Sequence, residues 1–246
     1  MPFYATDRDT QLAYWDRADA DHYEWQTGPT YFAETERDLV GMTGLGSAQR
    51  LLEIGCGEGA NLFHLGARKG WVGIDFSVAK LAFARGRMPG VRVTAADATR
   101  LPFADASFDA VLIRDVLHHV GDRQAVVDEA ARVLLPGGTL AAVEPNRGSP
   151  LIVAQAMLVK EERAVLRSTA RLIGRELADA GLTQVKVTYA QPLPMARIAQ
   201  HPKIGLGALA ATTGAKRVLS VAERLSARLV PRKHWMYLVA GGVKPQ

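Results

Sequence analysis

Between residues 50 and 144, short apolar runs alternate with longer segments of helical spacing, and this alternation constrains the fold more than any other feature. A strand-length apolar run on either side of a helix is the pattern of a βαβ unit, and repeated units build a parallel sheet with helices on its faces. The pattern therefore predicts an α/β protein. The predicted strands are 50–55, 71–75, 91–95, 108–113 and 138–144, and the predicted helices between them are 60–69, 78–88 and 122–135.

The pattern continues beyond the fifth strand. Residues 136–138, Pro-Gly-Gly, predict a sharp stop before that strand. A further helix is expected at 168–180, followed by strands at 184–190 and 234–240 that we expect to be antiparallel neighbours at one sheet edge. Residues 1–45 and 191–233 lack this rhythm, so both segments are expected to be helical.

Composition limits the cellular setting and the chemistry. The 246 residues include a single cysteine, which excludes a disulfide framework and a CxxC pair, so a reducing, cytoplasmic location is expected. The N-terminus lacks the apolar segment of a secretory signal, and the apolar-rich stretches 151–159 and 204–211 are too short to span a bilayer. We therefore expect a soluble protein.

Charge and aromatic side chains are unevenly distributed along the chain. Residues 1–146 carry 14 Lys/Arg and 20 Asp/Glu, whereas residues 147–246 carry 16 and 5. A basic C-terminal part suits a phosphate, a carboxylate, nucleic acid or an anionic membrane surface, and a solvated basic face is the alternative. Eight of the seventeen aromatic residues fall within the first 32 positions.

The residues most suited to ligand binding follow the predicted strands. Ligands of an open parallel sheet bind outside the carboxyl ends of the strands. Gly55, Gly57 and Gly59 follow the first strand and permit a tight turn whose N–H groups can approach a ligand. Asp75 ends the second strand twenty residues after Gly55, a separation at which an acidic side chain accepts ribose hydroxyls, and Asp97 follows the third strand. Helix capping is the alternative for both aspartates.

Five motifs in order carry a more specific resemblance. They are LLEIGCGEGANL (51–62), VGIDFS (72–77), AADATRLPF (95–103), FDAVLIRDVLHHV (108–120) and RVLLPGGTLAAVEP (132–145). Over about residues 45–145 the chain resembles the class I S-adenosylmethionine-dependent methyltransferases of the small-molecule type. The resemblance implies a Rossmann-like, doubly wound seven-stranded sheet that is mostly parallel with the last strand antiparallel, and an activity of class EC 2.1.1.

The resemblance also implies a cofactor, S-adenosyl-L-methionine, whose product is S-adenosyl-L-homocysteine. The glycine turn would lie under the methionine moiety with Glu53 near its amino group, and Asp75 would hold the ribose hydroxyls. Asp97 and the backbone of Ala98 would bind adenine. The complete set of implied cofactor-binding residues is Tyr14, Glu53, Gly55, Cys56, Gly57, Gly59, Asp75, Phe76, Asp97, Ala98, Ile113 and Arg114.

Candidate catalytic residues follow the fourth strand. Methyl transfer from a sulfonium is an in-line displacement, so positioning of the acceptor supplies most of the acceleration, and a base is needed only for an acidic proton. The candidates are Asp115, His118 and His119. On a helix, adjacent histidines diverge by roughly 100° and cannot both address one atom, and Asp115 also suits a helix N-cap. We expect no metal site, because no spaced set of His, Asp and Glu stands out.

The flanking segments are expected to cover the sheet. Tyr14, Trp15, Asp16 and Tyr23 resemble the N-terminal lid of many small-molecule methyltransferases, and simple packing on the sheet is the alternative. The predicted organisation is one methyltransferase domain, 1–246, with a helical lid at 1–45, a Rossmann-like core at 46–190 and 234–243, and a helical cap insertion at 191–233. Residues 150–233 are expected to face the acceptor, because basic residues recur there at helical intervals beside the aliphatic runs 151–159 and 204–211.

The leading hypothesis is methylation of a small-molecule acceptor that is anionic or amphipathic, such as a lipid-like or natural-product intermediate, with peripheral membrane contact through the basic C-terminal part. A nicotinamide dehydrogenase is disfavoured, because the glycine spacing is GxGxG rather than GxGxxG. An RNA methyltransferase remains an alternative, although no Asn-Pro-Pro-aromatic motif, second cysteine or RNA-binding module is present. A non-catalytic cofactor-binding protein is the other alternative, and the oligomeric state is left open.

Overall fold

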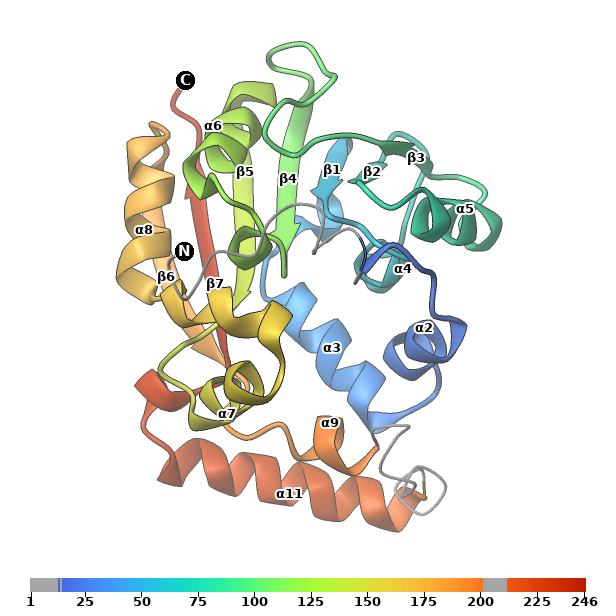
Figure 1. Cartoon of the computed structure of the whole chain (residues 1–246), viewed down its shortest axis with the longest axis vertical. Helices are drawn as coiled ribbons and strands as arrows, with labels where there is room; N and C mark the ends of the chain where they lie inside the picture. Colours follow the sequence, from blue (N-terminus) through green and yellow to red (C-terminus); the bar gives the residue numbers. More distant parts are fainter. Residues whose placement is uncertain (1–12, 14, 201–211) are drawn as a thin grey trace.

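The centre of the computed structural model, which describes residues 13, 15–200 and 212–246, is a seven-stranded sheet (Figure 1). Its strand order is β3-β2-β1-β4-β5-β7-β6. The first five strands in this order are parallel to one another, and β7 is antiparallel to β5 and β6. The predicted α/β sheet and the antiparallel pairing of the last two strands are confirmed. The strands are β1 (Leu51–Ile54), β2 (Val72–Asp75), β3 (Arg92–Ala95), β4 (Phe108–Arg114), β5 (Leu134–Pro145), β6 (Thr183–Ala190) and β7 (Tyr237–Val243).

Helices pack on both faces of the sheet. On one face the core includes Leu39 of α3 and Leu81 of α5, and on the other it includes Val126 of α6 and Leu177 of α8. The α-helices are α2 (Ala20–Thr27), α3 (Tyr31–Gly41), α4 (Ala60–His64), α5 (Val78–Arg87), α6 (Arg123–Val133), α7 (Pro150–Leu158), α8 (Ala170–Asp179), α9 (Met195–Ala199) and α11 (Thr213–Leu229). The 3-10 helices are η1 (Leu45–Ser47), η2 (Leu117–His119), η3 (Lys160–Arg167) and η5 (Arg232–His234).

Local sequence explains where several helices begin. Ser77, Asp122 and Thr169 precede α5, α6 and α8, and each side chain accepts a hydrogen bond from the backbone N–H three residues later. Such caps satisfy N–H groups that the first helical turn leaves without a partner, and each typically stabilises the helix by about 1 kcal/mol. The helices predicted at 78–88, 122–135 and 168–180 are therefore confirmed to within a few residues at each end.

The fifth strand differs from its prediction. The helix before it ends at Val133, ahead of the Pro-Gly-Gly sequence, but the predicted strand start at residue 138 is wrong, because β5 begins at Leu134 and continues through that sequence. Leu134 pairs with Phe108 and Thr139 pairs with Ala110, so residues 135–138 form a wide bulge inside the strand. Gly137 adopts a φ of +78° there and donates its N–H to Lys244 O. A glycine permits that conformation without strain, and the strand resumes after it.

Two further boundaries move. The helix expected at 60–69 ends at His64, where Ala67 N–H turns back to Leu62 O. The last strand starts at Tyr237 rather than at residue 234, because η5 occupies residues 232–234. Tyr14 and the aliphatic run 204–211 lie outside the described residues.

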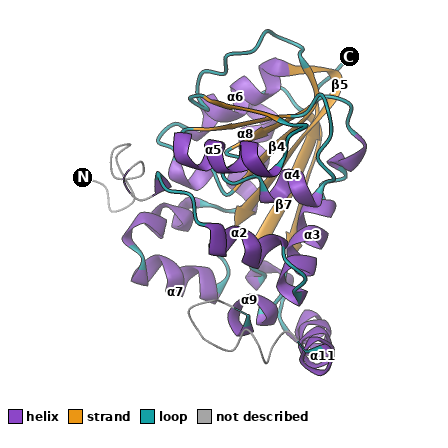
Figure 2. Cartoon of the chain, turned by 90° about the vertical axis from the view of Figure 1, so that its right-hand side faces the viewer, coloured by secondary structure: helices purple, strands orange, loops and turns teal. Residues whose placement is uncertain are grey.

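Helical segments from both flanks lie beyond the carboxyl ends of the parallel strands. Figures 1 and 2 show α7, α9 and α11 at this end of the molecule, with α2 and α3 beside them. The described parts of residues 1–45 and 191–233 are thus mainly helical, and α7 and η3 add to the cover. The division into lid, core and cap stays a prediction. None of the described helices has the length and apolar character needed to cross a membrane.

Candidate active site

A cavity of about 630 Å³ lies at the carboxyl ends of the parallel strands. Its lining follows the order of the strands in the sheet. The residues at this edge are Asp97 next to β3, Asp75 of β2, Gly55 next to β1, Asp115 next to β4 and Tyr237 of β7. Nine predicted site residues on the β1–β4 side line it: Gly55, Cys56, Gly57, Asp75, Phe76, Asp97, Ala98, Arg114 and Asp115. The side toward β5 and β7 adds His118, His119, Pro145, Ile152, Gln155, Glu162, Val165, Arg197, Met236 and Tyr237.

The glycine turn after β1 is fixed to the neighbouring strand. Gly55 has a φ of +75°, donates its N–H to Ile74 O at 2.8 Å and leaves no room for a side chain, since a Cβ would lie 2.1 Å from Val116 Cγ2. Gly57 N–H donates to Asp75 Oδ2 at 2.9 Å, and Ser77 N–H donates to Asp75 Oδ1 at 2.9 Å. Asp75 is therefore not a helix cap but the link between the glycine turn and β2, and burial raises its pKa.

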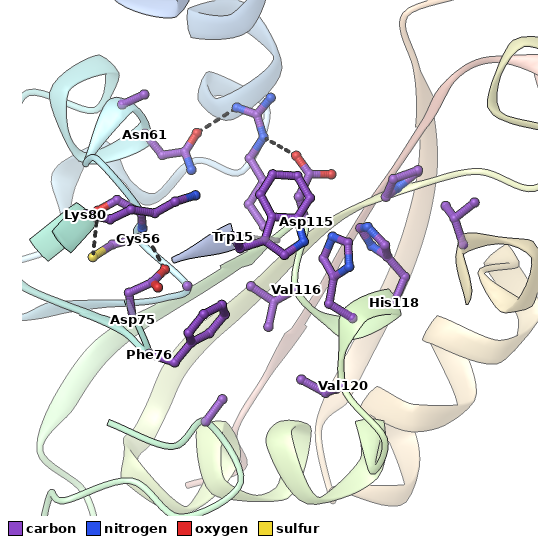
Figure 3. Close-up of a pocket in the computed structure, with 18 of the residues that line it drawn as sticks. Trp15, Cys56, Asn61, Asp75, Phe76, Lys80, Asp115, Val116, His118 and Val120 are labelled. Carbon is purple, nitrogen blue, oxygen red and sulfur yellow. Dashed lines mark hydrogen bonds and ion pairs between the residues drawn. The ribbon is translucent and has the colours of Figure 1, made fainter. Parts of the chain in front are cut away.

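The side of the cavity near β2 and β3 combines an aromatic ring with an acidic turn. Phe76 is 40% exposed and so is not a core residue; Figure 3 shows its ring beside Asp75. Asp97 Oδ1 accepts hydrogen bonds from Thr99 N–H at 2.9 Å and from Thr99 Oγ1 at 2.7 Å, in a turn rather than at a helix start. Both Asp97 and Ala98 face the cavity.

A buried polar chain lies behind the cavity wall. Asn61, which lines the cavity, donates through Nδ2 to Glu53 Oε1 at 2.6 Å and accepts from Arg114 Nη1 at 2.7 Å. Arg114 also bonds Glu36 of α3. Glu53 is completely buried, and this burial raises its pKa to about 8. The structure thus places Asn61, rather than Glu53, at the cavity surface.

Two other predicted residues also lie outside the cavity lining. Gly59, with a φ of +89°, packs against Met88, whose Cε would lie 2.0 Å from an added Cβ. Ile113 is fully buried in the sheet core. Tyr14 lies outside the described residues, so its predicted contact stays a prediction. Cys56 is buried and burial raises its pKa well above the usual range, which disfavours a nucleophilic thiolate.

Asp115 has an unusual backbone conformation at the end of β4. Its φ is +53°, an infrequent value for a residue with a side chain, and its N–H donates to Val143 O at 3.0 Å. The carboxylate faces the cavity with Oδ2 at 3.4 Å from Arg114 Nε. Desolvation raises the pKa of Asp115 to about 6, although the Arg114 guanidinium opposes that shift. Asp115 does not cap η2, whose N-cap position is Val116.

His118 is held between two glutamates. Its Nδ1 donates to Glu144 Oε2 at 2.7 Å, and its Nε2 lies 3.6 Å from Glu162 Oε2. Burial alone lowers the pKa of His118, but the two carboxylates outweigh it and raise the pKa to about 10. Glu144 is fixed in turn, because its Oε1 accepts the N–H groups of Val116 and Leu117. His118 is therefore protonated at neutral pH.

His119 has the opposite protonation state. Burial and the adjacent positive charge of His118 lower the pKa of His119 to about 3, so its ring is neutral. The prediction that the two histidines point apart is wrong, because residues 117–119 form a short 3-10 turn in which the ring centroids are 3.9 Å apart. Both rings face the same cavity. A ring nitrogen of each histidine and a carboxylate oxygen of Glu162 also lie within 4.8 Å of one another, a grouping of metal-ligand types that sequence spacing does not reveal.

Trp15, one of the residues of the predicted lid, lies over the cavity. Lys80 Nζ lies 5.0 Å from the centroid of its ring, and the His119 ring lies 5.3 Å away on an edge-to-face geometry. Asp16 Oδ1 accepts a hydrogen bond from Ser77 Oγ at 2.8 Å, which ties this segment to the start of α5. Trp15 therefore bridges the β2 side and the β4 side of the cavity (Figure 3).

Sequence reasoning missed several residues of this site. Glu144 was detectable, since it is the last residue but one of β5 and so lies near a strand end, as Asp75 does in β2. Asn61 was detectable as a polar residue on the helix after the glycine turn. Glu162 and Arg197 come from η3 and α9, where no strand end marks a position. Arg197 Nη1 donates to Tyr237 Oη at 2.8 Å, and burial raises the pKa of Tyr237 to about 12.

Fold and motifs together define a class of protein. The strand order with antiparallel β7, the glycine turn after β1 and the carboxylates after β2 and β3 form the arrangement of class I S-adenosylmethionine-dependent methyltransferases. Residues 52–142 match the family described as a methyltransferase domain, and the fold around them is that of class I methyltransferases.

Particular proteins resemble the chain over part of its length. A demethylmenaquinone methyltransferase of Mycobacterium sp. (strain KMS) is 42% identical over 126 residues, which are 51% of this chain and 53% of the relative. A 27-O-demethylrifamycin SV methyltransferase of Amycolatopsis mediterranei is 40% identical over 111 residues, 42% of this chain and 41% of the relative. The chain thus spans about half the length of the curated relatives it matches.

Solved structures extend the likeness of fold to most of the chain. Phosphoethanolamine N-methyltransferase 2 of Haemonchus contortus, solved with S-adenosyl-L-methionine, superposes with a TM-score of 0.65 at 21% identity. The superposition covers 91% of this chain and 56% of the other. At this identity the likeness concerns the fold.

Proposed function

We propose that this chain transfers a methyl group from S-adenosyl-L-methionine to a small-molecule acceptor. The observation that carries the proposal is a single cavity that joins the glycine turn and strand-end carboxylates to the polar groups that follow β4 and β5. A volume of about 630 Å³ is in the range of small-molecule sites. The family match and the names of the relatives support the same reaction class.

The residues of the β1–β4 side fit the proposed cofactor. Gly55 brings backbone to the cavity edge where a Cβ would collide with Val116, and Asp75 and Asp97 present carboxylate oxygens from neighbouring strand ends. Asn61 takes the place expected for Glu53 at the methionine end, with its amide fixed by Glu53 and Arg114. When bound, S-adenosyl-L-methionine supplies an electrophilic methyl group.

The residues after β4 provide the acid–base chemistry. His118 is already protonated and paired with Glu144, so it cannot take a proton from an acceptor, and His119 is too weakly basic. Asp115 combines access to the cavity with a pKa of about 6. We therefore assign Asp115 as the general base for acceptors that lose a proton, and the two histidines as polar contacts that orient the acceptor.

The acceptor class is supported by the lining on the β5 and β7 side. Ile152, Val165 and Met236 are apolar, while Arg197 and Tyr237 are polar, so the lining suits an amphipathic molecule with an anionic or hydroxyl group. The two curated relatives are named for demethylmenaquinone and demethylrifamycin, both small molecules. The cytoplasmic location stays a prediction and the oligomeric state stays open, and the acceptor assignment depends on neither.

The experiment is an assay for S-adenosyl-L-homocysteine with S-adenosyl-L-methionine and a panel of quinols, phenols, isoprenoid phosphates, amines and RNA. We expect product with at least one small-molecule class and none with RNA. Asp115→Asn should lower turnover of a hydroxyl acceptor by about 10²- to 10⁴-fold, the usual contribution of a general base. Cofactor binding without product from any class would favour the non-catalytic alternative, and product from RNA alone would contradict the small-molecule assignment.

A further inference from the structure

Helix α7 is unusually apolar for a surface helix. From Pro150 to Leu158 it carries no charged side chain. Met157 is 62% exposed and Leu158 is 86% exposed. A helix that is apolar on all sides is normally buried in a protein core or in lipid. Within the described residues the outer side of α7 therefore lacks the apolar cover that such a helix needs.

Helix α11 shows a second exposed apolar surface. Val218, Val221, Leu225 and Leu229 recur at intervals of three or four residues and are 46% to 80% exposed. Residues at these intervals lie along one side of a helix. The side that packs on the protein is a different one, because it includes the buried residue Leu219. The four residues form one continuous exposed row, which we call the α11 apolar row.

Basic residues run beside the α11 apolar row. Arg217, Arg224 and Arg228 each precede a member of that row by one position, which places them along an adjacent side of the helix. All three are exposed and form no ion pair with the described residues, whereas the neighbouring Lys216 pairs with Glu34. An apolar row with adjacent arginines is the pattern of a helix that lies in the interface of an anionic membrane.

The two surfaces lie at the end of the molecule where the cavity is covered. Figures 1 and 2 show α7 and α11 beyond the carboxyl ends of the parallel strands. The inner side of α7 contributes Ile152 and Gln155 to the cavity lining, and η3 contributes Val165. One short helix, α7, therefore lines the cavity with its inner side and exposes apolar side chains on its outer side.

We propose that α7 and α11 dock the protein on the surface of an anionic lipid bilayer, and that an amphipathic acceptor enters the cavity past α7. The docking stands independently, and the entry route rests on the proposed function. The charge distribution selects lipid over a second copy of the chain. Self-association through the α11 apolar row would bring two rows of unpaired arginines together, whereas anionic headgroups would neutralise them.

The test is co-sedimentation of the full chain with vesicles of phosphatidylcholine alone or with one third phosphatidylglycerol. We expect binding to the anionic vesicles, weak binding to the neutral ones, and a decrease in binding to the anionic vesicles as salt screens the arginines. Arg217→Gln/Arg224→Gln/Arg228→Gln should weaken binding at least about tenfold, since each basic residue near an anionic surface contributes about fivefold. Leu225→Ser/Leu229→Ser should weaken it in both low and high salt.

Control variants remove the same number of charges, or one exposed aliphatic side chain, elsewhere. Lys69→Gln/Arg92→Gln/Arg100→Gln loses three exposed basic residues near β3, and Val78→Ser loses an exposed aliphatic side chain of α5. Both controls should bind vesicles as the parent does. Unfolding temperatures of all variants show whether each one is folded.

Three outcomes would overturn the docking proposal: no binding of the parent chain to anionic vesicles, equal weakening by the controls, or a dimer in sedimentation velocity that Leu225→Ser/Leu229→Ser dissociates. Titration with S-adenosyl-L-homocysteine reports the proposed function separately. Vesicle binding by a chain that does not bind this product would contradict the methyltransferase assignment and leave the docking intact.

Discussion

Three neighbouring titratable residues carry three different charges at neutral pH: Asp115 is an anion, His118 is a cation and His119 is neutral. The pKa is about 6 for Asp115, about 10 for His118 and about 3 for His119. The causes are local: Glu144 and Glu162 stabilise the His118 cation, this cation and burial keep His119 neutral, and desolvation shifts Asp115 toward the neutral range. Of these three residues, only Asp115 has a pKa close enough to neutral pH for a general base.

The pH dependence of turnover tests this difference. Asp115 must lose its proton to act as a base, so kcat/KM for a hydroxyl acceptor should rise with pH through an apparent pKa near 6 and level off above it. Asp115→Asn should remove this rise together with most of the activity. His119→Gln should keep the rise, because a ring that is neutral throughout this pH range contributes no titration. A pH rise that survives in Asp115→Asn would contradict the assignment.

The buried Glu53 makes a prediction about stability. Its pKa is raised to about 8, so between about pH 4.5 and 8 the folded protein holds a proton that the unfolded chain has lost. The free energy of unfolding should therefore fall as pH rises through this window, by at most about 1.4 kcal/mol per pH unit from this group. Glu53→Gln keeps the shape and removes the titration.

Urea unfolding of the parent and of Glu53→Gln at several pH values between 5 and 9 measures this effect. The difference in free energy of unfolding should shift in favour of the variant as pH increases. Parallel pH profiles for the two proteins would show that Glu53 titrates normally and that the buried carboxyl is ionised.

At the residue scale, sequence predicted best where a strand end marks the position. Asp75 and Asp97 lie in the cavity for that reason, because parallel strands bring their carboxyl ends to one edge. The partner of His118, Glu162, lies 44 positions away on η3, and no spacing rule connects the two. The burial of Glu53 was not predicted either. Glu53 belongs to the expected motif, yet its side chain is buried and Asn61 lies between it and the cavity.

Among the elements, α6 and α8 are joined by a buried ionic contact. Arg123 Nε donates to Glu176 Oε1 at 2.6 Å, Arg123 Nη2 donates to Oε2 at 2.9 Å, and Arg123 Nη1 donates to Ser168 Oγ at 3.1 Å. Glu176→Gln should lower the free energy of unfolding by about 3 kcal/mol, because it leaves a buried guanidinium without its counter-ion.

The double variant Arg123→Met/Glu176→Leu checks that reason. It removes both charges and fills similar volume, so it should be less destabilised than Glu176→Gln. Chemical unfolding of the parent and the two variants gives the comparison. A double variant that is the least stable of the three would show that the ion pair contributes more than its desolvation costs.

The N-terminal segment also makes a prediction. Deletion of residues 1–17 removes Trp15 and Asp16 but leaves α2, whose Asp19 N–H donates to Glu58 Oε1 at 3.2 Å. The sheet should remain folded, because the described residues among those deleted, 13 and 15–17, are not part of the sheet core. Affinity for S-adenosyl-L-homocysteine should fall at least about tenfold if Trp15 covers the bound product, since burying one aromatic ring contributes more than 1.4 kcal/mol. Unchanged affinity would mean that the segment only packs on the domain.

The starts of helices were predictable where a capping residue is present. The start of a strand was not predictable where it depends on pairing with a strand distant in the sequence. Ser77 and Asp122 mark helix starts by their own chemistry. The start of β5 depends on Leu134 pairing with Phe108 across a bulge, which is a long-range contact that the local Pro-Gly-Gly sequence opposes. For the flanking segments the sequence predicted helices but not their positions, because apolar spacing identifies a helix but not the surface on which it packs.

For the whole molecule, the alternation of strands and helices was sufficient to predict the sheet, and the motif order was sufficient to predict the class of domain. The arrangement of α7, α9 and α11 required the structure. They complete one cavity whose β1–β4 side suits a nucleoside-bearing cofactor and whose β5 and β7 side suits an amphipathic acceptor. The proposed cofactor and acceptor sites are therefore two sides of this one cavity.

Calorimetric titration with S-adenosyl-L-homocysteine measures binding at the β1–β4 side of this cavity. We predict one molecule bound per chain, an affinity reduced by about 1–3 kcal/mol in Asp75→Ala through loss of a charged acceptor, and no change in the distant control Asp105→Ala. No heat of binding in the parent chain, or equal affinity in Asp75→Ala, would contradict a cofactor site at the strand ends.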